Sequence, residues 1–130
     1  MTLSWYFRDE RDATALAALA YVGVHGALVP PLWNVEIGHT LVKAERRGRI
    51  TRDQSATILA SLRSLPILVE SGGDSPAFPQ LALARAYDLS GYDAAYLELA
   101  MRIGIPLATR DEHLATKAEQ LRLRWTATLE

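Results

Sequence analysis

The chain has 130 residues, of which 49% are hydrophobic, and its formal net charge is −1. This composition predicts a single domain over residues 1–130 with a buried core, and it excludes an extended disordered chain. Because there is no cysteine, disulfides and thiolate metal sites are excluded, as is common in the reducing cytoplasm. No apolar run reaches about 18 residues and no secretory leader opens the sequence, so we expect a cytoplasmic protein without a membrane span.

Apolar spacing and the positions of glycine and proline predict an alternation of strands and helices. In chain order the expected segments are a strand at 2–7, a helix at 9–25, a strand at 27–30, helices at 32–48 and 51–65, a strand at 67–70, a loop at 71–76, helices at 75–89 and 90–104, a strand at 105–109, a helix at 111–123 and a strand at 124–129.

Short, wholly apolar strands between helices are typical of a parallel sheet that is covered on both faces, which predicts an α/β sandwich. The segment TLSWYF, residues 2–7, is the only candidate for a strand before the first helix. It starts almost at the first residue, so we expect a first strand that is truncated.

The segment KAERRGRITR is the main basic cluster of a chain whose overall charge does not indicate nucleic-acid binding. Its arginines Arg46, Arg47 and Arg49 are candidates for contact with an RNA backbone, since phosphate contacts dominate such affinity. The alternative is a solvated helix end, where cations are favourable next to the helix C-terminus.

Three acids follow the predicted strands or begin helices on the same predicted edge of the sheet, namely Glu36, Asp93 and Asp111. Ligands of α/β sheets collect at the carboxyl ends of the strands. Each acid also has a simpler interpretation. Glu36 fits a solvated helix stripe, while Ser90-x-x-Asp93 and Thr109-x-x-Glu112 fit capping boxes.

Converged carboxylates repel each other unless a cation holds them, and the hard cations Mg²⁺ and Mn²⁺ prefer oxygen ligands. A metal bound in this way suits the hydrolysis of phosphodiesters. The histidines His25, His39 and His113 show no metal-binding spacing and are interpreted as surface or packing residues.

The motifs PPLWNVE, YDAAYLELA and LATRD, in this order, resemble those of PIN-domain proteins, and most closely the VapC-like toxin ribonucleases of type II toxin–antitoxin pairs. The resemblance implies a PIN-like three-layer α/β/α sandwich with a central, mainly parallel sheet. It also implies a Mg²⁺-dependent endoribonuclease, a homodimer and a cognate antitoxin. Glu36, Asp93 and Asp111 match three acids of the family, and Thr109 matches a hydroxyl residue that supports the last one.

The chain departs from the family pattern at two points. His39 stands where the family often has asparagine, and the family's first acid would fall upstream of Met1. The acids at positions 9, 10 and 12 would lie too far along an extended chain to replace it, because a strand rises about 3.3 Å per residue. A second hypothesis is therefore a catalytically impaired PIN module that binds an antitoxin, another partner or RNA. A third is an unrelated α/β binding domain.

The antitoxin that the resemblance implies needs an apolar surface on which to dock. The apolar residues from Leu16 to Val22 are one candidate for this contact. The alternative is that these residues pack on the sheet.

Overall fold

The computed structural model describes residues 1–72 and 78–127. The chain divides into two compact units, which we call the N-terminal unit (Thr2–Val69) and the C-terminal unit (Glu70–Glu130) and describe separately. Most of the loop expected at 71–76 and the end of the strand expected at 124–129 fall outside the described residues. Within the described ranges, no helix is both long enough and apolar enough to cross a membrane.

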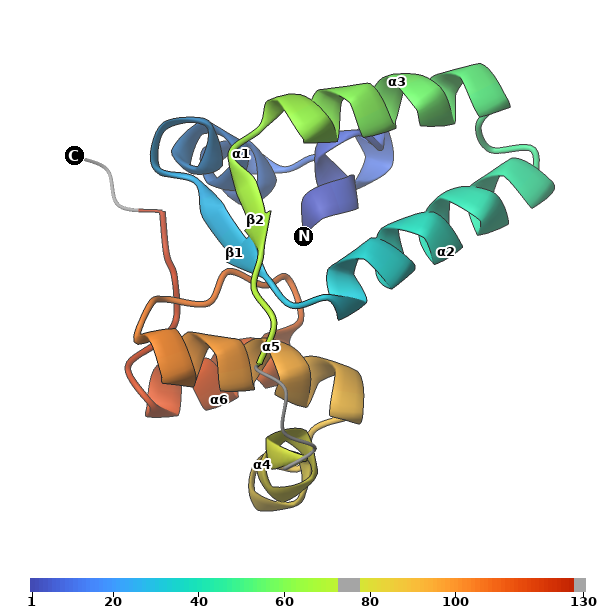
Figure 1. Cartoon of the computed structure of the whole chain (residues 1–130). Helices are drawn as coiled ribbons and strands as arrows, with labels where there is room; N and C mark the ends of the chain where they lie inside the picture. Colours follow the sequence, from blue (N-terminus) through green and yellow to red (C-terminus); the bar gives the residue numbers. More distant parts are fainter. Residues whose placement is uncertain (73–77, 128–130) are drawn as a thin grey trace. The chain divides into compact units, whose positions relative to one another are not determined.

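The N-terminal unit consists of helices packed with a short parallel sheet (Figure 1). Its regular elements are α1 (Ala13–His25), β1 (Ala27–Val29), α2 (Leu32–Arg46), α3 (Arg52–Ser64) and β2 (Ile67–Val69). The two strands pair in parallel with Leu28 opposite Leu68, which confirms the parallel pairing that the sequence predicts. Gly26 makes this pairing possible, because a Cβ at that position would lie 3.0 Å from the carbonyl oxygen of Pro66.

The helix boundaries of this unit follow from local capping chemistry. Asp12 caps α1, since its Oδ1 accepts a hydrogen bond of 2.8 Å from the N–H of Ala15. Thr51 and Gln54 form a reciprocal capping box at the start of α3. The helical segment of α2 ends before Gly48, which adopts a φ of +72°. A helix end at this glycine is what its position in the sequence predicts.

The N-terminal segment differs from the sequence prediction. The residues expected to form a strand at 2–7 instead form the 3₁₀ helix η1 (Thr2–Trp5), which is followed by a second, η2 (Arg8–Glu10). The strand prediction was wrong because aromatic residues are enriched in strands for the way their side chains pack. They do not by themselves require an extended backbone. Here Trp5 and Phe7 are each only 5% exposed, while the backbone pairs locally through Tyr6 N–H and Leu3 C=O.

Side-chain hydrogen bonds attach this segment to two helices of the same unit. The indole Nε1 of Trp33 on α2 donates to Thr2 Oγ1 at 3.0 Å. The hydroxyls of Tyr6 and Ser61, the latter on α3, lie 2.8 Å apart. The N-terminal segment is therefore an integral part of the packing of this unit.

The C-terminal unit contains α4 (Pro79–Tyr87), α5 (Gly91–Ile103) and α6 (Glu112–Gln120). The strands expected at 105–109 and 124–129 were wrong as strands, because they reduce to one parallel bridge between Leu107 and Arg124. Leu107 supplies both bonds of this bridge, since its N–H donates to Leu123 C=O and its C=O accepts from Trp125 N–H. The next N–H that could extend the ladder, that of Ile105, instead donates to Ala100 C=O at the end of α5.

The core of this unit lies between α5 and α6. Leu97 is fully buried there, and it packs in one cluster with Ala100, Leu107, Leu114 and Ala118. This packing fixes the two helices that carry Asp93 and Asp111.

Candidate active site

Asp111 is the N-cap residue of α6. Its Oδ1 accepts a hydrogen bond of 2.8 Å from the N–H of Leu114, and its own N–H donates to Thr109 Oγ1 at 3.1 Å. The capping box considered for Thr109 and Glu112 is wrong, because Thr109 bonds to the cap residue and Asp111 performs the capping. Thr109 thus holds the backbone at the position from which the Asp111 carboxylate extends.

Asp93 lies in the first turn of α5 and is partly buried. The N-cap of this helix is Ser90, whose Oγ accepts a hydrogen bond of 3.1 Å from the N–H of Asp93. This bond supports the cap that the sequence predicts at Ser90. Both aspartates therefore have a backbone N–H bonded to a hydroxyl just upstream, and both lie at the positive end of a helix, which favours a carboxylate.

A hydrogen bond links the first turn of α6 to the C-terminal end of α4, shortly before the start of α5. His113 Nε2 lies 2.7 Å from the backbone oxygen of Asp88, to which the ring donates. His113 comes two residues after Asp111, and Asp88 comes five residues before Asp93. The C-terminal unit thus places Asp93 and Asp111 at the starts of two helices that share one core.

Glu36 is partly buried on α2, in the N-terminal unit. Pro31, at the N-cap position of this helix, makes no side-chain capping bond. The first turn is instead attached to the N-terminal segment by the hydrogen bond from Trp33 Nε1 to Thr2 Oγ1. Because Glu36 and the two aspartates belong to separately described units, their convergence stays a prediction. Over residues 1–72 and 78–127, no group of three or more His, Asp or Glu side chains is placed to hold a metal ion.

The basic cluster lies at the end of α2 and in the turn that follows. Arg46 and Arg47 are exposed and make no ion pair with any described residue. Arg49 is different, because its guanidinium pairs with Asp9 at 2.7 Å and lies over the ring of Phe7. Residue spacing does not predict this contact, and its one signal in the sequence is the complementary charge of the acidic DERD segment and the basic RRGR segment.

Comparison with known proteins now identifies the fold. The PIN domain family matches residues 2–120 of the chain. This chain belongs to the PIN domain family. The fold class predicted from the sequence is thereby confirmed.

Relatives of this PIN domain include named ribonucleases. Ribonuclease VapC1 of Mycobacterium tuberculosis is 32% identical over 87 residues, which cover 66% of this chain and 63% of that protein. Ribonuclease VapC3 of Pyrobaculum aerophilum is 35% identical over 86 residues, covering 63% of each. The aligned segments thus span less than two thirds of these relatives. The similarity confirms the predicted likeness to VapC proteins.

A solved structure resembles this PIN domain over most of its length. The match to the crystal structure of PAE2754 from Pyrobaculum aerophilum covers 86% of this chain and 92% of the PAE2754 chain. Its TM-score is 0.58 and the sequence identity is 29%. The parallel pair β1–β2 and the helical content agree with that fold class.

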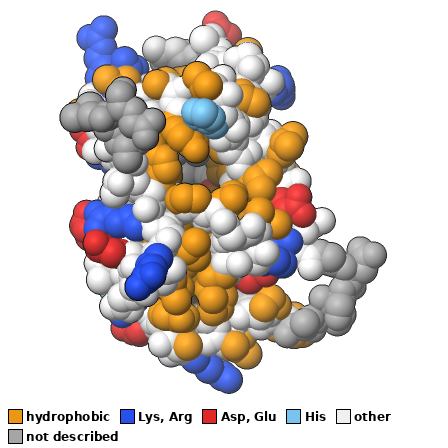
Figure 2. Space-filling model, turned by 90° about the vertical axis from the view of Figure 1, so that its left-hand side faces the viewer, with side chains coloured by type: hydrophobic (Ala, Val, Ile, Leu, Met, Phe, Trp, Pro, Cys, Tyr) orange, Lys and Arg blue, Asp and Glu red, His pale blue; other side chains and the backbone are white. Residues whose placement is uncertain are grey.

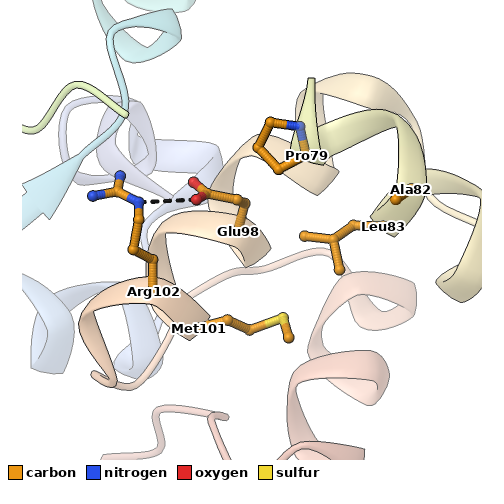
Figure 3. A pocket seen from close by; sticks show the side chains of 6 residues that line it. All are labelled: Pro79, Ala82, Leu83, Glu98, Met101 and Arg102. Carbon is orange, nitrogen blue, oxygen red and sulfur yellow. Dashed lines mark hydrogen bonds and ion pairs between the residues drawn. The ribbon is translucent and has the colours of Figure 1, made fainter. Parts of the chain in front are cut away.

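An open apolar groove lies between α4 and α5 in the C-terminal unit. It encloses about 400 Å³ and is lined by Pro79, Ala82, Leu83, Glu98, Met101 and Arg102. Figure 3 shows Leu83 from α4 and Met101 from α5 facing this hollow, with the 2.9 Å Glu98–Arg102 ion pair on one side. Because its wall is almost wholly apolar, the groove suits a hydrophobic contact and not phosphate.

The apolar helix α1 divides its side chains between two environments. Val22 is buried, whereas Leu16, Tyr21 and Val24 are exposed to 48%, 45% and 78%. Packing in the unit accounts for the first side chain but not for the other three. Figure 2 shows that hydrophobic side chains are exposed at the surface of the PIN domain.

Proposed function

We propose that this PIN domain is a metal-dependent endoribonuclease, the toxin of a toxin–antitoxin pair. The observation that carries the proposal is that Asp93 and Asp111 both lie at the N-terminal ends of helices, α5 and α6, that pack on one core in the C-terminal unit. The names of the relatives VapC1 and VapC3, both ribonucleases, support the same activity. Glu36 is the third acid of the proposed site.

The ligand atoms of the proposed site are carboxylate oxygens, which suit a hard divalent cation such as Mg²⁺ or Mn²⁺. Such a cation, when bound, supplies Lewis-acid activation of water for attack on a phosphodiester. The carboxylates fit such a cation by their chemistry: two of them lie at helix starts of the C-terminal unit, and the third, Glu36, belongs to the N-terminal unit. We therefore assign roles to the side chains alone.

The side chains of the proposed site have distinct tasks. Asp111 uses Oδ1 to cap α6, while its Oδ2 makes no hydrogen bond within the described part of the chain and stays open to a ligand. Thr109 and Ser90 fix the backbone beside the two aspartates. Arg46 and Arg47 contribute exposed positive charge to hold the RNA backbone.

Two apolar surfaces are assigned to protein partners in this proposal. The exposed side chains Leu16, Tyr21 and Val24 of α1 form the proposed contact with an antitoxin. The groove between α4 and α5, with the exposed Phe78 beside it, is the proposed homodimer contact. Because the substrate would be cellular RNA, the proposed place of action is the cytoplasm.

A second candidate function is a catalytically impaired PIN module that binds an antitoxin, another partner or RNA. The observation that favours it is that the C-terminal unit by itself supplies only two of the proposed acids, Asp93 and Asp111. The loss of residues that support a metal site typically costs 10–100-fold in affinity or activity. Such a module would retain its apolar surfaces and its basic cluster.

A circular single-stranded RNA separates these two functions. An endoribonuclease linearises the circle in the presence of Mg²⁺ or Mn²⁺ and leaves it intact in EDTA. An impaired module leaves the circle intact under both conditions while still shifting its mobility in a native gel. Linearisation in EDTA would contradict the metal-dependent mechanism.

A further inference from the structure

Arg49 is held by the N-terminal segment through two different kinds of contact. Its Nη2 donates to both carboxylate oxygens of Asp9, at 2.7 and 2.8 Å, and lies 3.7 Å from a carboxylate oxygen of Glu10. Its Cζ lies 4.3 Å from the centre of the Phe7 ring, a distance at which a guanidinium is attracted to an aromatic face.

The guanidinium is only partly satisfied by these contacts. Arginine carries five N–H donors in a rigid plane, and Asp9 engages Nη2 alone. Nη1 and Nε of Arg49 make no hydrogen bond to any described residue. The group therefore retains donors that can reach an anion from outside.

The two kinds of contact differ in how firmly they hold Arg49. The Phe7 ring is 5% exposed and is thus fixed by the packing around it. The side chains of Asp9, Glu10 and Arg49 are 73%, 46% and 41% exposed. Ion pairs this exposed contribute little, because water and salt screen them. The ring therefore sets the position of the guanidinium, and the carboxylates are exchangeable.

We propose that Arg49 is a preset binding group for an RNA phosphodiester, and that Asp9 and Glu10 compete with RNA for it. The carboxylate stands in for the phosphate, since both present the anionic oxygens that a guanidinium recognises in its plane. Arg46, Arg47 and Arg52 are exposed close by in sequence and form no ion pair with described residues. A bound RNA would thus meet further cations beside Arg49. The choice of RNA as the anion rests on the proposed function.

The test is the affinity for a fluorescein-labelled single-stranded RNA, measured by fluorescence anisotropy at low salt in EDTA, so that no cleavage occurs. The double variant Asp9→Asn with Glu10→Gln is expected to bind about two- to five-fold more tightly, because an exposed ion pair no longer competes. The slope of log affinity against log salt is expected to steepen by up to about 0.7, the value for one phosphate contact on a single strand.

Two control variants test whether Asp9 and Glu10 act by competing with RNA for Arg49. Asp53→Asn removes one negative charge, as Asp9→Asn alone does, from an exposed acid in the first turn of α3, and it should change the affinity less than Asp9→Asn alone. Arg49→Gln should weaken RNA binding and abolish the gain from the double variant. Thermal unfolding of every variant shows whether it is folded at the assay temperature.

The proposal is overturned if the double variant lowers the Tm but leaves RNA affinity unchanged. The ion pair of Arg49 with Asp9 and Glu10 would then only stabilise the fold. It is also overturned if Asp53→Asn tightens binding equally, if the gain persists with Arg49→Gln, or if no form binds RNA. Because EDTA is present throughout, a failure of the nuclease proposal in the circular-RNA assay leaves a positive binding result intact.

Discussion

Asp111 is predicted to have two separable roles, one in capping α6 and one in binding a cation. Asparagine is as good an N-cap as aspartate, whereas alanine loses the 2.8 Å bond to the Leu114 N–H. Asp111→Ala should therefore lower the free energy of unfolding by about 1 kcal/mol, which is about 3–5 °C in Tm for a chain of this size. Asp111→Asn should leave the Tm of the metal-free protein within about 1 °C of that of the unmodified protein.

Addition of Mg²⁺ tests the second role of Asp111, cation binding, separately from its capping of α6. A cation at about 100 times its Kd stabilises a folded protein by about 2.7 kcal/mol, so the unmodified chain should show a clear rise in Tm. Both Asp111 variants should lose most of this rise, since each lacks the charged ligand. Differential scanning fluorimetry with Mg²⁺ and with EDTA gives both quantities. The reasoning is refuted if Asp111→Asn keeps the full Mg²⁺-induced shift, or if Asp111→Ala is as stable without metal as the unmodified protein.

Two further predictions concern the packing that supports the site. Leu97→Ala should cost about 2–5 kcal/mol in the free energy of unfolding, because it leaves a cavity at a side chain with 0% exposure; urea denaturation measures this, and a loss below 1 kcal/mol would contradict the packing. Tyr6→Phe should cost about 1 kcal/mol by removing the 2.8 Å hydroxyl contact with Ser61. A Ser61→Ala variant should show a similar loss, with no further loss in the double variant, and additive losses would exclude a shared hydrogen bond.

The sequence predicts this fold well wherever local chemistry decides the outcome. Thr51 and Gln54 cap α3, and Gly48 ends the segment after α2, at the positions that their residue types predict. The prediction fails where tertiary packing decides. The aromatic residues of 2–7 indicate burial, but they cannot show that Trp5 and Phe7 would be buried from a 3₁₀ turn instead of a strand.

For the candidate site, the sequence predicts which acids begin helices but not how they are held. Residue spacing alone favours Thr109 as a cap, yet the structure gives that role to Asp111, because Thr109 bonds to the N–H of the cap residue. The hydrogen bond from His113 to the backbone oxygen of Asp88 joins residues 25 positions apart, so no local sequence pattern predicts it. The same holds for Asp9 and Arg49, whose pairing depends on how the N-terminal segment packs.

The central claim is that carboxylates at the starts of α5 and α6 support metal-dependent RNA cleavage. The most direct measurement is the initial rate of cleavage of a labelled RNA with Mg²⁺ by the unmodified protein, Asp93→Asn and the matched control Asp53→Asn, which also alters an acid in a helix first turn. The account predicts cleavage by the unmodified protein and the control, and a loss of more than about 10-fold in a folded Asp93→Asn, since even residues that only support metal ligands cost about 10–100-fold when lost. Equal cleavage by Asp93→Asn and the unmodified protein, or cleavage that persists in EDTA, would contradict it.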